Sequence, residues 1–386
     1  MILQAMEIFV ALAVCIGHAC IWTTLLNVLY SQPLPKWFLK PWRLLTGLVI
    51  VAFPLLVIRT HDGYLHAPRN LYGSGWLYHD ACFIFGAISL PVVTLVRNLR
   101  PRPRCVLQER TVTLDLWKAL GPAARGCGKG HWLTRLPGNG VFRLDVTELT
   151  LRMPQLPASL DGLSVLLLSD LHFHGTPSRP WFDAVIDRLL QFPTPDVVVL
   201  AGDFVDTDTH HEWIGPILGR LRWNEVGVAI LGNHDIQHRP ERTREELAKL
   251  GFDILGDGSK EIEIRGEACV FTGNEAPWFP APTSVPDGGF RICVSHSPDQ
   301  FTWAHRHGFD LILCGHVHGG QIRLPVIGSI FVPSFYGRRY DMGVFEKGGT
   351  VMVVGRGLSG KEPLRFRCHP QVIRMVLRCG SSEPAA

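Results

Sequence analysis

The chain has 386 residues, of which 46% are hydrophobic and 19% are charged, and its formal net charge is +4. This length leaves room for more than one domain, and so small a net charge does not indicate a nucleic-acid-binding protein. The ten cysteines are scattered and form no CxxC pair, so they do not favour a disulfide framework and fit a reducing compartment.

Three apolar runs near the amino terminus account for the high hydrophobic content; they cover residues 6–30, 44–58 and 81–96. The first run is long enough to cross a bilayer as a helix. The other two are near the lower length limit and need their flanking aromatic residues to span. Buried core helices are the alternative interpretation of these two runs. We predict a membrane region with about three transmembrane helices over residues 1–96.

The basic residues that flank these runs predict their orientation. They are Lys36, Lys40 and Arg43 between the first two runs, only Arg59 and Arg69 between the second and third, and Arg97, Arg100, Arg102 and Arg104 after the third. Loops rich in lysine and arginine stay in the cytoplasm, so the amino terminus is expected outside and the rest of the chain inside. No basic segment precedes the first run, which argues against a cleaved signal peptide. The protein is therefore expected to be a multi-pass protein of the cell (inner) membrane.

Residues 97–140 are basic and rich in glycine and proline, with "RPRPR" and "GPAARGCGKGHW" as the extremes. This composition predicts a juxtamembrane linker, with a short helix around residues 111–120.

Residues 141–386 alternate strand and helix signals. Apolar runs that end at polar clusters predict strands at 163–170, 195–203, 225–235, 290–297 and 309–318. Helical spacing of apolar residues follows the first of these, and "ERTREELAKLG" has the pattern of a helix that ends on glycine. We expect a mixed α/β domain built of layers.

Carboxylate, amide and imidazole side chains stand where the predicted strands end. They are Asp170, His172, Asp203, Asn233, His234, His296, His316 and His318. Because sites in open α/β sheets assemble at the carboxyl ends of strands, these side chains are expected to converge. His316 and His318 are two residues apart, so a strand would send both rings to one face, towards neighbouring metal ions. A polar turn after a strand is the alternative for these two residues.

The set resembles, motif by motif and in order, the calcineurin-like metallophosphoesterase superfamily over about residues 160–365. The matched motifs are Asp-x-His, Gly-Asp, Gly-Asn-His-Asp, a single histidine and Gly-His-x-His. The resemblance implies a four-layer α/β/β/α sandwich that follows the transmembrane region and the linker.

The resemblance also implies two divalent metal ions, manganese, iron or zinc, whose ligands contain no thiolate. Asp170, His172 and His318 would bind one ion, Asn233, His296 and His316 the other, and Asp203 would bridge them. Hydroxide held between the ions would attack the phosphorus in line.

His234 resembles the family's catalytic histidine, which stabilises the transition state or protonates the leaving group, and Asp235 beside it is expected to orient the imidazole. The alternative is a supporting histidine that transfers no proton. His174 is extra to the motif set and is interpreted as a histidine at the rim of the site, close to substrate, and not as a ligand.

"GHVHGGQ", the "RLP" that follows it and "GRGLSG" most resemble the bacterial membrane-associated phosphodiesterase branch. We therefore expect a membrane-anchored dimetal phosphoesterase that cleaves a phosphodiester or pyrophosphate bond, and its location favours a lipid-linked substrate. One alternative is a phosphomonoesterase, including a protein phosphatase. Another is a non-catalytic scaffold of the same fold, although scaffolds usually lose ligands and this chain keeps them all. No nucleic-acid partner is expected, and the sequence leaves the oligomeric state open.

Overall fold

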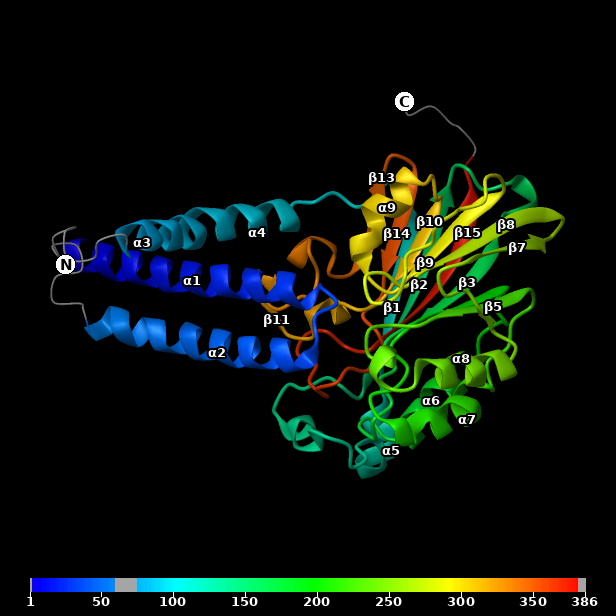
Figure 1. Ribbon diagram of the computed structural model, residues 1–386, viewed down its shortest axis with the longest axis horizontal. Helices are drawn as coiled ribbons and strands as arrows, with labels where there is room; N and C mark the ends of the chain where they lie inside the picture. Colours follow the sequence, from blue (N-terminus) through cyan, green and yellow to red (C-terminus); the bar gives the residue numbers. More distant parts are fainter. Residues whose placement is uncertain (1, 60–74, 381–386) are drawn as a thin grey trace. The chain divides into compact units, whose positions relative to one another are not determined.

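The computed structural model describes residues 2–59 and 75–380 (Figure 1). The chain divides into two compact units. The helical unit holds the residues up to Pro101 together with the segment Pro325–Arg339. The sheet unit holds Arg102–Leu324 and the residues from Tyr340 onward.

The helical unit contains three candidate membrane spans, Gln4–Tyr30, Lys36–Val57 and Leu77–Asn98, which are long and apolar enough to cross a bilayer. Its helices are α1 (Ile2–Tyr30), α2 (Lys36–Arg59), α3 (Gly75–Ile84), the π-helical turn η3 (Phe85–Ser89) and α4 (Leu90–Asn98). The spans contain the first and third predicted apolar runs, and the second span begins eight residues before the second run and ends one residue before its last residue. Their apolar side chains are mostly exposed on the helix surfaces, as expected for helices that face lipid.

Glycines let α1 approach the third span closely. A Cβ atom on Gly17 would lie 1.7 Å from the Cys82 carbonyl oxygen, and one on Gly86 would lie 1.8 Å from that of Ala13. His18 adds a polar link: its Nε2 donates to the Val49 carbonyl (3.2 Å), and its Nδ1 accepts from the Tyr78 hydroxyl (2.6 Å). Small residues and hydrogen bonds of this kind hold transmembrane helices together.

The sheet unit is built on two sheets. The first has the order β1 (Val106–Asp115), β2 (Arg143–Met153), β15 (Gln371–Cys379), β3 (Leu163–Leu168), β4 (Val197–Ala201), β5 (Val226–Ile230) and β6 (Asp253–Ile254). The second has the order β13 (Gly343–Lys347), β14 (Thr350–Val354), β10 (Leu311–Cys314), β9 (Phe290–Ser295), β8 (Glu267–Asn274) and β7 (Ser259–Ile264). Strands β3, β4, β5 and β6 run parallel to one another, and so do β8, β9, β10 and β14, whereas β15 and β7 pair antiparallel with β3 and β8.

Helices cover the outer faces of the two sheets (Figure 1). Those next to the first sheet are α5 (Leu116–Leu120), α6 (Arg179–Leu189), α7 (Ile214–Leu218) and α8 (Pro240–Lys249), and α9 (Phe301–Arg306) packs on the second. One apolar core lies between the sheets and another lies between the first sheet and its helices. This arrangement confirms the predicted four-layer α/β/β/α sandwich.

Helix α6 shows how the sequence produces one layer. The Ser178 side chain caps its first turn by accepting from the Trp181 backbone N–H, and a proline follows at the first helical positions. Its buried face carries Trp181, Phe182, Val185, Ile186 and Leu189, which recur at helical spacing. The other helical elements described are short 3-10 turns: η4 (Gly121–Ala124), η5 (His131–Arg135), η6 (Ala158–Leu160), η7 (Asp208–Trp213), η8 (Asp235–Gln237), η9 (Pro298–Gln300), η10 (His318–Gly320) and η11 (Gly337–Tyr340). Two further short strands are β11 (Arg323–Leu324) and β12 (Gly328–Ser329).

The stretch 97–140 differs from the expected linker. It contains β1, which pairs antiparallel with β2 as an edge of the first sheet, and α5 forms only after β1 has ended. Most β1 side chains are exposed, so the strand lacks the apolar alternation that would have indicated it. The sheet unit therefore begins at Arg102 and not at Val141.

Asp145 on β2 fastens this edge of the sheet. Its carboxylate accepts from the Thr113 hydroxyl (2.5 Å), from Arg356 Nη2 (2.8 Å) and from His369 Nδ1 (3.2 Å). Burial raises the pKa of Asp145, but these partners outweigh it and bring the pKa down to about 2. The ion pair with Asp145 also fixes the position of the Arg356 guanidinium.

We expect Asp145→Asn to lower the free energy of unfolding by about 1–2 kcal/mol at neutral pH, after allowance for solvent screening. Because the folded pKa lies below the unfolded value, the contribution is present above about pH 4 and is lost as the pH falls towards 2. Urea unfolding of both proteins in detergent at several pH values measures this. A difference that stays constant from pH 7 to pH 3 would show that the carboxylate charge is not the cause.

Candidate metal centre

The predicted site residues lie just beyond the carboxyl ends of five strands. Strands β3, β4 and β5 of the first sheet and β9 and β10 of the second end at the same edge, because neighbours within each set are parallel. The loops after these strands carry Asp170 and His172, Asp203, Asn233 and His234, His296, and His316 and His318, respectively. The fold thus brings together residues that are almost 150 positions apart in the chain.

The backbone at this edge is strained. Asp170, His172, Asp203, His316 and His318 all have φ between +46° and +70°, a region that side chains other than glycine rarely adopt. Such strain persists only where the surrounding structure enforces it, and it gathers at functional sites.

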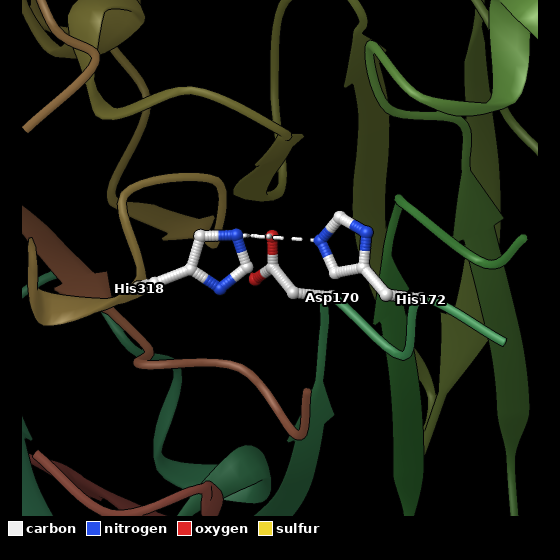
Figure 2. Close-up of side chains that lie close together, drawn as sticks. All are labelled: Asp170, His172 and His318. Carbon is white, nitrogen blue, oxygen red and sulfur yellow. Dashed lines mark hydrogen bonds and ion pairs between the residues drawn. The ribbon is translucent and has the colours of Figure 1, made fainter. Parts of the chain in front are cut away.

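Asp170, His172 and His318 form a first group that could hold an ion (Figure 2). The Nε2 atoms of the two histidines face each other at 3.3 Å, and His318 Nε2 lies 3.7 Å from Asp170 Oδ1. Burial, and then the charge of Arg365, holds the pKa of His318 well below its usual value, so its imidazole is neutral. A neutral imidazole is the form that binds a metal.

Asp203, His296 and His316 form a second, fully buried group. His296 Nε2 lies 3.2 Å from Asp203 Oδ2 and 3.2 Å from Asn233 Oδ1. The other ring nitrogen of His296, Nδ1, donates to the Ala201 carbonyl at 2.7 Å. This bond fixes the ring and directs Nε2 into the site, an arrangement that is usual for a metal-bound histidine.

Asp203 belongs to the second group and also forms, with His172 and His234, a third group that could hold an ion. Its Oδ1 accepts from the His234 backbone N–H (2.8 Å), while the buried Oδ2 makes no hydrogen bond within the described residues. Oδ2 lies 3.2 Å from His296 Nε2 and 3.5 Å from His172 Nε2. Burial raises the pKa of Asp203, but the charges of His296 and His234 hold it well below its usual value. An ionised buried oxygen without a hydrogen bond, flanked by imidazole nitrogens, fits a position next to a cation.

Asp206 is a site residue that sequence reasoning missed. Its carboxylate accepts from His172 Nδ1 at 3.2 Å and, through its other oxygen, from His234 Nδ1. Burial raises the pKa of Asp206, but the charges of His234 and His172 bring it well below its usual value. The acid that ends "GDFVD", three residues after Asp203, was the signal available in the sequence.

Asp235 does not orient the His234 ring, contrary to expectation, because Asp206 occupies that position. The Asp235 carboxylate accepts from the backbone N–H groups of Asp203 (2.9 Å), Phe204 (2.8 Å) and Gly232 (2.8 Å). It therefore shapes the loops after β4 and β5. Burial, followed by the charge of Asp203, raises the pKa of Asp235 to about 7.

Two further residues border the site. His174 is buried, its Nε2 lies 3.2 Å from the Gly360 carbonyl, and it belongs to none of the groups that could hold an ion among the described residues. Arg365, which the sequence did not indicate, is fully buried and donates through Nη1 to the carbonyls of His318 (3.1 Å) and Arg356 (2.8 Å). Arg365 therefore holds the backbone of His318, a predicted metal ligand.

Comparison with known proteins agrees with this geometry. Residues 163–320 match the family model described as calcineurin-like phosphoesterase. The uncharacterized metallophosphoesterase YkuE of Bacillus subtilis is 30% identical over 287 residues, which cover 70% of this chain and 98% of YkuE. The phosphodiesterase YaeI of Escherichia coli is 28% identical over 226 residues, or 55% of this chain and 81% of YaeI.

A third relative is named as a transmembrane protein. The transmembrane protein with metallophosphoesterase domain of Danio rerio is 26% identical over 263 residues, or 60% of this chain and 57% of that protein. The near-complete coverage of YkuE, together with the ordered motifs, establishes the assignment. This chain belongs to the calcineurin-like phosphoesterase superfamily, in the branch that contains these bacterial metallophosphoesterases.

Proposed function

We propose that this protein is a membrane-anchored dimetal phosphodiesterase that hydrolyses a phosphodiester or pyrophosphate bond of a lipid-linked substrate. The observation that carries the proposal is the buried Asp203 Oδ2, which makes no hydrogen bond within the described residues and lies between two imidazole nitrogens. The position of the Asp203 carboxylate and its negative charge suit a ligand that is shared by two cations.

The first and second groups of side chains give the proposed ligand sets. Asp170, His172 and His318 would hold one ion, and His296, His316 and Asn233 the other, with Asp203 shared. Oxygen and imidazole donors without thiolate suit manganese, iron or zinc. Bound there, the ions would make hydroxide available near neutral pH and neutralise the charge on the phosphate.

The remaining chemistry is assigned to His234. Asp206 fixes its Nδ1, so Nε2 is the nitrogen that can give a proton to the leaving oxygen as the P–O bond breaks. The His234 side chain is partly exposed, unlike those of His172 and His296, so a substrate can reach it. Imidazole is a common general acid in enzymes.

The membrane location supports a substrate at the bilayer surface, since an anchored enzyme meets lipids at a far higher local concentration than soluble esters. The lysines and arginines around the spans support a cytoplasmic sheet unit and an inner-membrane location, as predicted from the sequence. Of those residues, Arg69 lies outside the described part of the chain.

The test uses the full-length protein in detergent, stripped of metal with EDTA and reloaded with manganese. Hydrolysis of bis(p-nitrophenyl) phosphate is expected to disappear on stripping, to return on reloading and to exceed that of p-nitrophenyl phosphate. Diester hydrolysis that survives stripping would contradict the metal sites. Faster monoester hydrolysis would favour the phosphomonoesterase, and a folded, metal-loaded protein that cleaves neither ester would favour the scaffold.

Asp206→Asn is expected to lower kcat/KM for the diester about 10- to 100-fold, because it loosens the rings of both His172 and His234. Manganese affinity is expected to fall as well, since His172 is a proposed ligand. Asp208→Asn is the control: this residue is two positions further on, half-exposed, and contacts His238. If Asp206→Asn keeps full activity and metal affinity, the carboxylate does not position these rings.

A further inference from the structure

The segment Pro325–Arg339 stands apart from its neighbours in the sequence because it belongs to the helical unit. The Val332 backbone N–H donates to Asn27 Oδ1 of α1 at 3.0 Å, and the rings of Phe331 and Tyr30 meet edge to face at 5.5 Å. The Val326 carbonyl accepts from Asn98 Nδ2 at the end of α4 (3.1 Å). The segment is thus fastened to two different spans.

These contacts fall at the ends of the spans. The first span, Gln4–Tyr30, is 27 residues long, or about 40 Å of helix, whereas the hydrocarbon core of a bilayer is about 30 Å thick. Its last turn, with Asn27 and Tyr30, therefore lies at or beyond the edge of the hydrocarbon. Asn98 is the last residue of the third span. The segment must then lie at the depth of the lipid headgroups.

The outer surface of the segment is apolar and basic. Val326 and Phe335 expose 75% and 62% of their surface, and Ile330 exposes 39%. Arg338 and Arg339 follow in the same segment, and Arg97 Nη1 donates to the Ile327 carbonyl at 3.5 Å. Apolar side chains among arginines at headgroup depth are typical of a surface that dips into an anionic leaflet.

Trp37 is a further exposed apolar side chain near the same end of the spans. Only residues 31–35 separate the end of α1 from the start of α2, so Trp37 lies near the same boundary, and 76% of its surface is exposed. Tryptophan at the headgroup level is a common membrane anchor.

We propose that the segment 325–339, with Trp37, is a surface that binds the headgroup and upper acyl region of an anionic bilayer and presents lipid-borne phosphodiesters to the metal centre. The choice of substrate rests on the proposed function. The surface itself rests on the contacts and exposures above.

The covalent chain connects this surface to the site. Only residues 319–324 separate His318 from Pro325, and however the two units are arranged they can span no more than about 25 Å. Within the sheet unit, Arg323 Nη1 donates to the Gly319 carbonyl (2.8 Å) and to Asp341 Oδ2 (2.7 Å), so the residues that precede and follow the segment are bonded to each other. The start of the segment is therefore joined to the loop that carries His316 and His318 by residues 319–324 alone.

Photocrosslinking tests the surface. The full-length protein with p-benzoylphenylalanine in place of Phe335 is reconstituted in vesicles of phosphatidylcholine with a minority of radiolabelled phosphatidylglycerol and irradiated. Leu190, an exposed apolar residue at the end of α6 in the sheet unit, is the control position. Label is expected at position 335 and not at 190. Absence of label at 335, or equal label at both positions, would overturn the proposal.

Kinetics test delivery of the substrate. Val326→Ser with Phe335→Ser is expected to slow hydrolysis of a chromogenic phosphatidyl diester in such vesicles about tenfold. Hydrolysis of soluble bis(p-nitrophenyl) phosphate should stay within about twofold, and Leu190→Ser should alter neither rate. Equal loss on both substrates would overturn the delivery role. If wild-type protein cleaves only the soluble diester, the proposed lipid substrate is wrong, but the phosphodiesterase activity stands. If it cleaves neither ester, the proposed function is wrong, and the crosslinking result alone decides whether the segment binds lipid.

Discussion

Asp203→Asn is expected to reduce kcat/KM for the diester by about two to three orders of magnitude. The substitution keeps the size of the side chain but removes the negative charge from an oxygen that lies 3.2 Å from His296 Nε2 and 3.5 Å from His172 Nε2. A shared ligand affects both proposed ions, and charge stabilisation by such ions is worth several kcal/mol in the transition state.

The chain offers a matched control on the same strand. Asp196 immediately precedes β4 and Asp203 follows it, so the two acids lie at opposite ends of that strand. Asp196 accepts from the Ser164 backbone N–H (2.8 Å) and from Arg265 Nη2 (2.9 Å), which makes it structural. Asp196→Asn is expected to lower stability while leaving the activity of the folded protein intact. Equal activity losses in both variants would mean that Asp203 acts through the fold and not through metal.

His234→Ala is expected to lower kcat by about 10² to 10⁴ for a diester with an alkyl leaving group, because that group departs only with a proton. For bis(p-nitrophenyl) phosphate the loss should be much smaller, since nitrophenolate is stable as an anion. This difference distinguishes proton donation from a purely supporting role, which would affect both esters alike.

His238→Ala is the control for this prediction. His238 lies four residues further on, and its Nδ1 contacts Asp208 outside the groups that could hold an ion. Rates for both esters are measured at saturating manganese, so that a lower affinity for metal in the variant is not mistaken for the loss of a proton donor. If the two esters slow by the same factor in His234→Ala, His234 does not protonate the leaving group.

The residues at the strand ends were predictable from the sequence because each is attached to a conspicuous local pattern. An apolar run indicates a buried strand, and Asp170, Asp203 and His316 come just after such runs. Parallel neighbours then bring the strand ends together, so order along the chain was enough to predict convergence. The same runs predicted mixed α/β layers, whereas the four-layer sandwich was implied by the family resemblance.

Other residues were not predictable because their partners are distant in sequence. Asp206 and Asp235 both lie near the site motifs, yet only the folded loops show that Asp206 contacts His234 while Asp235 binds backbone N–H groups. Strand β1 was missed because its exposed side chains leave no apolar pattern. The sequence also did not indicate that the segment 325–339 belongs to the helical unit. Its contacts with Asn27 and Asn98 join residues that are more than 200 positions apart.

If Asp203 joins two metal ions in one buried site, electron paramagnetic resonance of the full-length protein, stripped and then titrated with Mn²⁺, will detect the pair. We expect the spectrum of two exchange-coupled Mn²⁺ ions at saturation, replaced in Asp203→Asn by that of isolated ions. A wild-type protein that saturates with isolated Mn²⁺ alone would contradict the shared ligand, and with it the dimetal centre.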